Sequence, residues 1–123
     1  MRSTRLAVTS LLLGLVATSV TAANDRIPLK VLYLGNEEQR RSDFGEFLQN
    51  TFVESDAIPH AAFDPESASD FDVVILDWSQ REANSENAVS PLGDREAWST
   101  PTVLLGSAGH LMAAPWEVAG GSG

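Results

Sequence analysis

The sequence contains no cysteine. This absence excludes disulfide bonds, a thiolate nucleophile and thiolate metal sites. Histidine is also scarce, because only His60 and His110 occur, and they lack the spacing of a metal-binding pair. The sequence therefore indicates no metal site and no cofactor.

Basic residues are few. The chain of 123 residues has 8 lysines and arginines against 17 aspartates and glutamates, a net charge of −9. Phosphate backbones and anionic membrane surfaces attract clusters of lysine and arginine, which this chain does not have. The composition therefore argues against nucleic acid and anionic membrane surfaces as partners.

Long apolar runs are absent except near the N-terminus. Residues 6–20 are mostly apolar, follow Arg2 and Arg5, and precede the small residues of "VTAA". A run of about 15 apolar residues is shorter than the roughly 20 that a membrane-spanning helix needs. The pattern predicts a secretory signal peptide over residues 1–23, with cleavage after Ala22 or Ala23. A retained anchor is the alternative.

Export defines the rest of the chain. Without Arg2 and Arg5 the net charge falls from −9 to −11, because the first 23 residues contain no acid. We expect an exported protein, periplasmic or extracellular, with no stable membrane insertion after signal removal. The remaining residues 24–123 can form one domain with a modest core.

Strand and helix patterns alternate along these residues. A strand rich in β-formers is followed by a helical pattern that begins with Asn36 as its cap and carries four apolar residues at helical spacing. These residues, expected to pack on the sheet, are Phe44, Phe47, Leu48 and Phe52. The expected strands are 29–34, 73–76 and 102–105, with an ambiguous strand over 57–63; the expected helices are 36–55 and one that starts at His110.

This alternation predicts an α/β fold with a parallel, three-layer, flavodoxin-like or Rossmann-like sheet. Doubly wound domains usually have about five strands or more. With three clear strands and one ambiguous strand, the sheet is expected to be incomplete, as in the front portion of a larger domain. Residues 79–99 hold Pro91 and Gly93 without a sustained period, so they are predicted to be an irregular connection with one short helix.

Ligands of such sheets bind beyond the carboxyl ends of the strands. Three segments fall on that edge, namely residues 35–38, 77–80 and 106–110. The candidates for ligand binding are Gly35, Asn36, Asp77, Trp78, Gly106, Ser107, Gly109 and His110.

Ser107 is the one catalytic candidate. The stretch "LGSAG" has the form of a strand-to-helix turn that can raise a nucleophile above a sheet. The strict pattern requires glycine two residues before the serine, where Leu105 stands. A base is also needed, but His110 lies in the same turn and His60 in the ambiguous strand. We therefore interpret the stretch as a structural corner.

Asp77 ends the apolar strand "VVIL". Such an acid can accept a phosphoryl group, bind a metal or anchor backbone amides, and the last role is the commonest. Glu37 and Glu38 are interpreted as first-turn acids that favour the helix dipole.

Four segments occur in the order "KVLYLG", "RRSDFGEFLQNTF", "FDVVILDW" and "PLGDREAWSTPTVLLGSAG". Together they resemble the first half of a ThuA-like domain, a group in the class I glutamine amidotransferase-like superfamily. In amidotransferases an elbow of the form G-x-C-x-G-H follows a strand that begins with proline. Here Pro101 begins the strand, Gly109 and His110 match the final pair, and Ser107 occupies the cysteine position.

The resemblance implies binding of a small molecule or carbohydrate, or a sugar-related hydrolase or lyase activity. Loss of the cysteine argues against glutamine hydrolysis. Two alternatives remain. One is a receiver domain, whose phosphorylation site is imitated by Glu37, Glu38, Asp77 and Ser107 but whose lysine is absent. The other is a non-catalytic exported binding module.

Overall fold

The computed structural model describes residues 25–84, 88–113 and 115–117. The predicted signal peptide and the glycine-rich C-terminal residues lie outside this part. Within it, no helix combines the length and apolar character needed to cross a bilayer.

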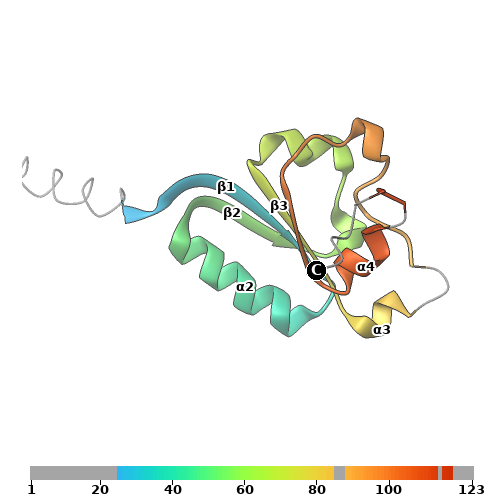
Figure 1. The fold of residues 1–123 in the computed structure, drawn as a ribbon. Coiled ribbons are helices and arrows are strands. Elements are labelled where there is room, and N and C mark those ends of the chain that lie inside the picture. The colour runs from blue at the N-terminus through green and yellow to red at the C-terminus, as the bar shows by residue number, and fades with distance from the viewer. Residues whose placement is uncertain (1–24, 85–87, 114, 118–123) are drawn as a thin grey trace, which may run out of the picture.

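Four strands form one sheet in which every neighbouring pair is parallel. They are β1 (Ile27–Leu34), β2 (Phe52–Ile58), β3 (Val73–Trp78) and β4 (Thr102–Gly106), in the spatial order β2-β1-β3-β4 (Figure 1). Helical segments flank the sheet, so the arrangement is flavodoxin-like or Rossmann-like. The predicted fold class is confirmed, as is the parallel pairing of the three clear strands.

Helix α2 (Glu38–Thr51) covers one face of the sheet over β1 and β2 (Figure 1). Its Leu48 is buried against Val31 and Tyr33, and the ring of Phe44 stacks on that of Tyr33 with centroids 4.6 Å apart. Phe47, by contrast, is 59% exposed, so the prediction that it packs on the sheet is wrong.

The predicted helix 36–55 is too long at both ends. Glu37, not Asn36, is the N-cap residue, and the chain becomes extended at Phe52, the first residue of β2. The second strand therefore begins five residues before the predicted position 57. Parallel pairing with β1, such as Val31 opposite Ser55, satisfies the backbone of this segment and overrides the helical spacing of its aromatic residues.

The opposite face of the sheet carries the larger apolar cluster. It is covered by two 3-10 segments, η2 (His60–Ala62) and η3 (Pro65–Asp70), and by helix α4 (Ala108–Ala113). This helix starts two residues before the predicted His110. Residues 79–99 contain the short helix α3 (Gln80–Ala83) and the 3-10 turn η4 (Arg95–Ala97), in agreement with the predicted irregular connection.

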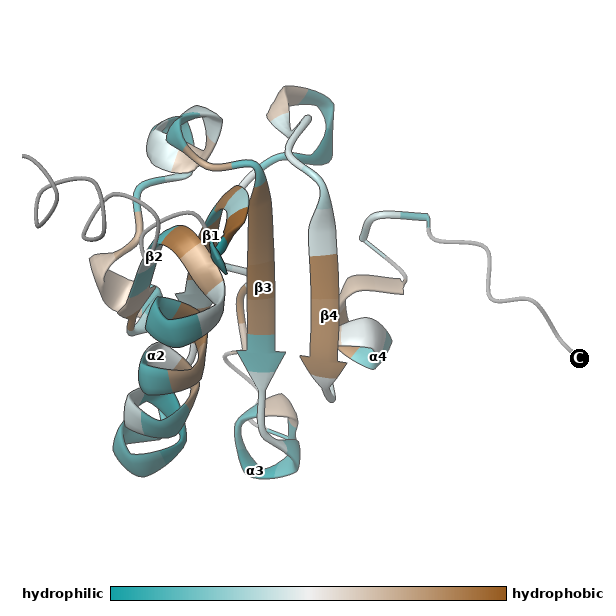
Figure 2. Cartoon of the chain, turned by 90° about the vertical axis from the view of Figure 1, so that its left-hand side faces the viewer, coloured by the Kyte–Doolittle hydropathy of each residue, from teal (hydrophilic) through white to brown (hydrophobic). Residues whose placement is uncertain are grey.

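The strand order creates a crevice at one edge. From β1 the chain passes to β2 on one side and then returns to β3 on the other side of β1. The two connections leave in opposite directions, and this switch point is where open α/β sheets bind ligands. Figure 2 shows β3 apolar along most of its length and hydrophilic at its carboxyl end, where Asp77 lies.

Candidate functional site

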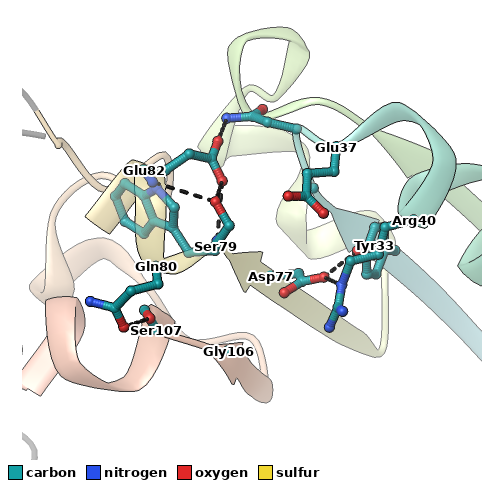
Figure 3. Close-up of a pocket in the computed structure, with 12 residues that line it drawn as sticks. Tyr33, Glu37, Arg40, Asp77, Ser79, Gln80, Glu82, Gly106 and Ser107 are labelled. Atoms are coloured by element: carbon teal, nitrogen blue, oxygen red, sulfur yellow. Dashed lines mark hydrogen bonds and ion pairs between the residues drawn. The ribbon is translucent and has the colours of Figure 1, made fainter. Parts of the chain in front are cut away.

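A cavity of about 220 Å³ opens at this switch point (Figure 3). It is lined by residues at the carboxyl ends of β1, β3 and β4 and directly after them, together with the starts of α2 and α3. The lining residues are Tyr33, Gly35, Asn36, Glu37, Arg40, Asp77, Trp78, Ser79, Gln80, Glu82, Gly106 and Ser107.

The sheet edge brings together six of the eight residues singled out from the sequence. Gly35, Asn36, Asp77, Trp78, Gly106 and Ser107 line the cavity. The other two, Gly109 and His110, do not line it; they are exposed on the first turn of α4.

Asp77 is the buried charge of the site, with 6% of its surface exposed. Tyr33 pairs with Ile75 in the sheet register, so Asp77, two residues further, lies on the same face, toward α2. Its Oδ2 atom accepts hydrogen bonds from the hydroxyl of Tyr33 and from Nε of Arg40, which also forms an ion pair with it.

These contacts shift the pKa of both donors. Burial, and then the hydrogen bond to Asp77, raise the pKa of Tyr33 well above its ordinary value, so the phenol stays protonated. The hydrogen bond to Asp77 raises the pKa of Arg40. Oδ2 of Asp77 is therefore held by two side chains, those of Tyr33 and Arg40, and not by the backbone amides that the favoured interpretation of the sequence named.

Asn36 joins three segments instead of capping α2. Its Oδ1 accepts from the backbone N–H of His60 at 2.9 Å, and its Nδ2 donates to Oε1 of Glu82 at 2.6 Å. Nδ2 also lies 3.3 Å from Nδ1 of His60. The other ring nitrogen, Nε2, is 2.9 Å from the carbonyl oxygen of Asp77. A carbonyl accepts only, so Nε2 carries the proton and Nδ1 accepts from Asn36.

Glu82 closes the cavity from α3. Ser79 and Glu82 form a capping box: the Ser79 hydroxyl accepts from the Glu82 N–H, and Glu82 Oε2 accepts from the Ser79 N–H at 3.1 Å. Burial acts to raise the pKa of Glu82, but the hydrogen bonds from Asn36 and Ser79 outweigh it, so this pKa is lowered. Ser79 and Glu82 fit the capping-box spacing S-x-x-E, a signal that was readable in the sequence.

The turn after β4 is a strained corner. Gly106 has φ of 63°, and a Cβ atom there would lie 2.6 Å from the carbonyl oxygen of Trp78. That same carbonyl accepts from the N–H of Ser107 at 2.8 Å. Only glycine fits this position, because it tolerates a positive φ and has no Cβ atom to collide with the Trp78 carbonyl.

The Ser107 hydroxyl donates to Oε1 of Gln80 at 2.8 Å. No histidine in the described part of the chain forms a hydrogen bond with it, and a serine nucleophile is commonly activated by a histidine in that position. Residues 25–84, 88–113 and 115–117 also contain no cluster of three acids or histidines arranged to hold a metal ion.

The cavity can therefore bind a ligand through hydroxyls, amides and carboxylates. No family model, curated protein or solved structure matches this chain.

Sequence reasoning missed Tyr33, Arg40 and Glu82. Tyr33 lies within an apolar strand and was indistinguishable from a core residue. Arg40 belongs to the site because α2 begins at the sheet edge and its first turn passes over Asp77. Trp78 was correctly placed at the edge, but only 4% of its surface is exposed, so its ring is not an open platform for stacking.

Proposed function

We propose that this chain is a binding domain for a small polar molecule, such as a carbohydrate, and has no nucleophilic catalysis of its own. The observation that carries this is the cavity at the β1/β3 switch point, lined by polar groups from five segments. Its volume of about 220 Å³ is smaller than the roughly 300–1,000 Å³ of pockets for drug-sized ligands. A ligand of monosaccharide size matches it.

We also propose that the chain belongs with ThuA-like, class I glutamine amidotransferase-like domains. The support is the order of its sequence segments, together with Ser107 and Gly109–His110 at the elbow positions. The parallel sheet is compatible with this assignment. Leu105 and the missing cysteine are the departures, and both argue for binding over glutamine hydrolysis.

Binding is tested with a panel of monosaccharides and polyols, monitored by saturation-transfer NMR and thermal shift. The variant Ser107→Leu places a larger side chain in the cavity, and Ser42→Leu makes the same change on the exposed face of α2. We expect Ser107→Leu to abolish binding and Ser42→Leu to retain it. Equal binding by both variants would place the ligand elsewhere.

The absence of nucleophilic catalysis is tested with a serine-reactive fluorophosphonate. We expect no labelling of Ser107, because its hydroxyl donates to Gln80 and no histidine among the described residues forms a hydrogen bond with it. Labelling that disappears in Ser107→Ala would refute this part of the proposal.

The receiver-type phosphoacceptor is the second candidate. Glu37, Asp77 and Ser107 line one cavity, which supports this candidate, but Glu38, the fourth residue of the imitated site, does not line it. Against it, Oδ2 of Asp77 is already bonded to Tyr33 and Arg40. Incubation with acetyl phosphate and Mg²⁺ distinguishes the two functions, since a phosphoryl mass on Asp77 would favour the receiver.

Export is proposed from the first 23 residues. Mass spectrometry of the protein purified from the secreted or periplasmic fraction should show an N-terminus near Asn24. Recovery of cytoplasmic protein that still begins at Met1 would contradict export.

A further inference from the structure

Negatively charged side chains outnumber positively charged ones around the cavity. Three lining carboxylates, those of Glu37, Asp77 and Glu82, face one lining guanidinium, that of Arg40. Arg40 is paired with Asp77, which balances its charge. Glu82 accepts from Asn36 and Ser79, but these neutral donors leave its negative charge in place. The cavity therefore has a net negative charge.

Glu37 differs from the other two lining carboxylates in its contacts with the described residues. It is the N-cap residue of α2 but makes no side-chain capping bond, and no hydrogen bond or ion pair joins its carboxylate to another described residue. Figure 3 shows this carboxylate extending from the start of α2 on the side of the cavity where Asp77 lies. It is available to a ligand.

Asp77 supplies a second, independent acceptor. Its side chain is 7% exposed, and both of its hydrogen bonds within the described residues use Oδ2. Oδ1 faces the Gly106 side, 3.3 Å from where a Cβ on that glycine would lie. Figure 3 shows this oxygen directed away from Tyr33 and Arg40. No buried side-chain oxygen among the described residues lacks a hydrogen-bond partner, so Oδ1 is accessible and can accept a hydrogen bond from a ligand in the cavity.

We propose that the cavity selects ligands carrying a positively charged nitrogen, and that Glu37 is the residue that determines this specificity. An ammonium group supplies several N–H donors and the opposite charge, which Glu37 and Oδ1 of Asp77 both accept. A carboxylate or phosphate would instead face the unpaired charge of Glu37. This inference rests on the proposed binding function and specifies its ligand.

The test compares three sugars of one ring size that differ in charge, namely glucosamine, glucose and glucuronate. Binding to the 123-residue chain is measured by calorimetry or NMR titration, at a mildly acidic pH where the amine is protonated. We expect glucosamine to bind about five-fold more tightly than glucose, as a partly exposed ion pair allows, and glucuronate to bind most weakly. Added salt should reduce the difference.

Two variants locate the effect. Glu37→Gln removes the cavity carboxylate, and Glu38→Gln removes the same charge one residue further along, outside the cavity. We expect Glu37→Gln to bind glucosamine and glucose equally, and Glu38→Gln to keep the preference. An equal loss in both variants would overturn the role of Glu37.

The remaining outcomes separate the two proposals. If the sugars bind but glucuronate is preferred, or charge has no effect, the proposed selectivity is wrong and the binding function stands. If the chain binds none of the three sugars, nor any member of the wider panel, the binding function itself is contradicted.

Discussion

Asp77 shows at the scale of one residue how the site is stabilised. A buried carboxylate without partners is strongly unfavourable. Removing one partner of a buried ion pair destabilises a protein more than replacing the whole pair with apolar residues. Tyr33 and Arg40 supply donors from two different elements, β1 and α2. Gly35 allows this arrangement, since a Cβ atom there would lie 2.6 Å from the Tyr33 ring.

Tyr33 gives a direct measurement of this arrangement because it is the only tyrosine in the chain. Its pKa is raised by burial and by Asp77, so the native protein should show phenolate absorbance only well above pH 10, roughly the ordinary tyrosine value. A raised pKa contributes stability below about pH 10 that is lost as the pH rises through the folded-state value. In denaturant the titration should return to about 10.

The variant Tyr33→Phe checks the stability part of this prediction. It removes one hydrogen bond to a charged group, and we expect a loss of about 1–2 kcal/mol in the free energy of unfolding, measured with urea at neutral pH. Its unfolding should also lack the alkaline dependence of the original chain. If Tyr33 of the native protein titrated near pH 10, as unperturbed tyrosines do, the buried hydrogen bond to Asp77 would be contradicted.

At the scale of elements, short segments acquire their positions from polar contacts at the sheet edge. Helix α3 has only four residues and no buried side chain, so packing cannot hold it. Its capping box and the bond from Asn36 to Glu82 attach it to the loop after β1. The corner between β4 and α4 is likewise held by a polar contact, the hydrogen bond from the Ser107 N–H to the Trp78 carbonyl, and Gly106 allows its geometry.

Glu82→Gln tests the attachment of α3 by its dependence on pH. The folded-state pKa of Glu82 is lowered, so its charge contributes stability above about pH 4.3, the ordinary value, and this contribution is lost as the pH falls through the folded-state pKa. Urea unfolding should show the variant less stable at neutral pH and equal to the original chain in acid. Glu38→Gln is the matched control. If the difference in stability between Glu82→Gln and the original chain were the same in acid as at neutral pH, the charge of Glu82 would not be its cause.

Gly106→Ala tests the corner. Alanine at φ of 63° meets the Trp78 carbonyl at 2.6 Å, and we expect a loss of more than about 1–2 kcal/mol, the cost of the left-handed region alone for an L-residue. Gly109→Ala, where a Cβ meets nothing within 4 Å, should instead stabilise helix α4 by up to about 1 kcal/mol. Thermal denaturation of the two variants should therefore shift in opposite directions.

At the scale of the whole molecule, the two faces of the sheet are covered unequally. The cluster under α2 includes residues of β1, β2 and β3 but none of β4. Val103 of β4 is 46% exposed. Figure 2 shows β3 and β4 open toward the viewer beside α2. Stability is therefore concentrated in the centre of the sheet and on its opposite face.

Two valine variants test whether the two faces of the sheet are covered unequally. Val74 is 0% exposed in the larger cluster, and Val74→Ala should lower the free energy of unfolding by about 2 kcal/mol. Val103→Ala removes the same two carbons from an exposed position, and we expect a change within about 0.5 kcal/mol. Equal losses in urea unfolding would show that Val103 is covered in solution.

The sequence alone determined the elements with strong local patterns. The strands 29–34, 73–76 and 102–105 were recognisable because their apolar, β-branched runs are bounded by acids, glycine or proline, and parallel pairing followed from their alternation with helices. The sheet edge followed from the same reasoning, which is why six of the eight proposed residues line the cavity.

Only the tertiary structure decided the rest. The boundary at Phe52 depends on backbone pairing with β1, which the helical spacing of the aromatic residues conceals. The grouping of Tyr33, Arg40 and Asp77 depends on sheet register and on where α2 begins, since these residues come from three elements. His60 was assigned to a strand, yet it contacts Asn36 and the Asp77 backbone across the edge. Local sequence specifies which segments are buried, whereas the partners of a polar group far along the chain depend on how the segments pack.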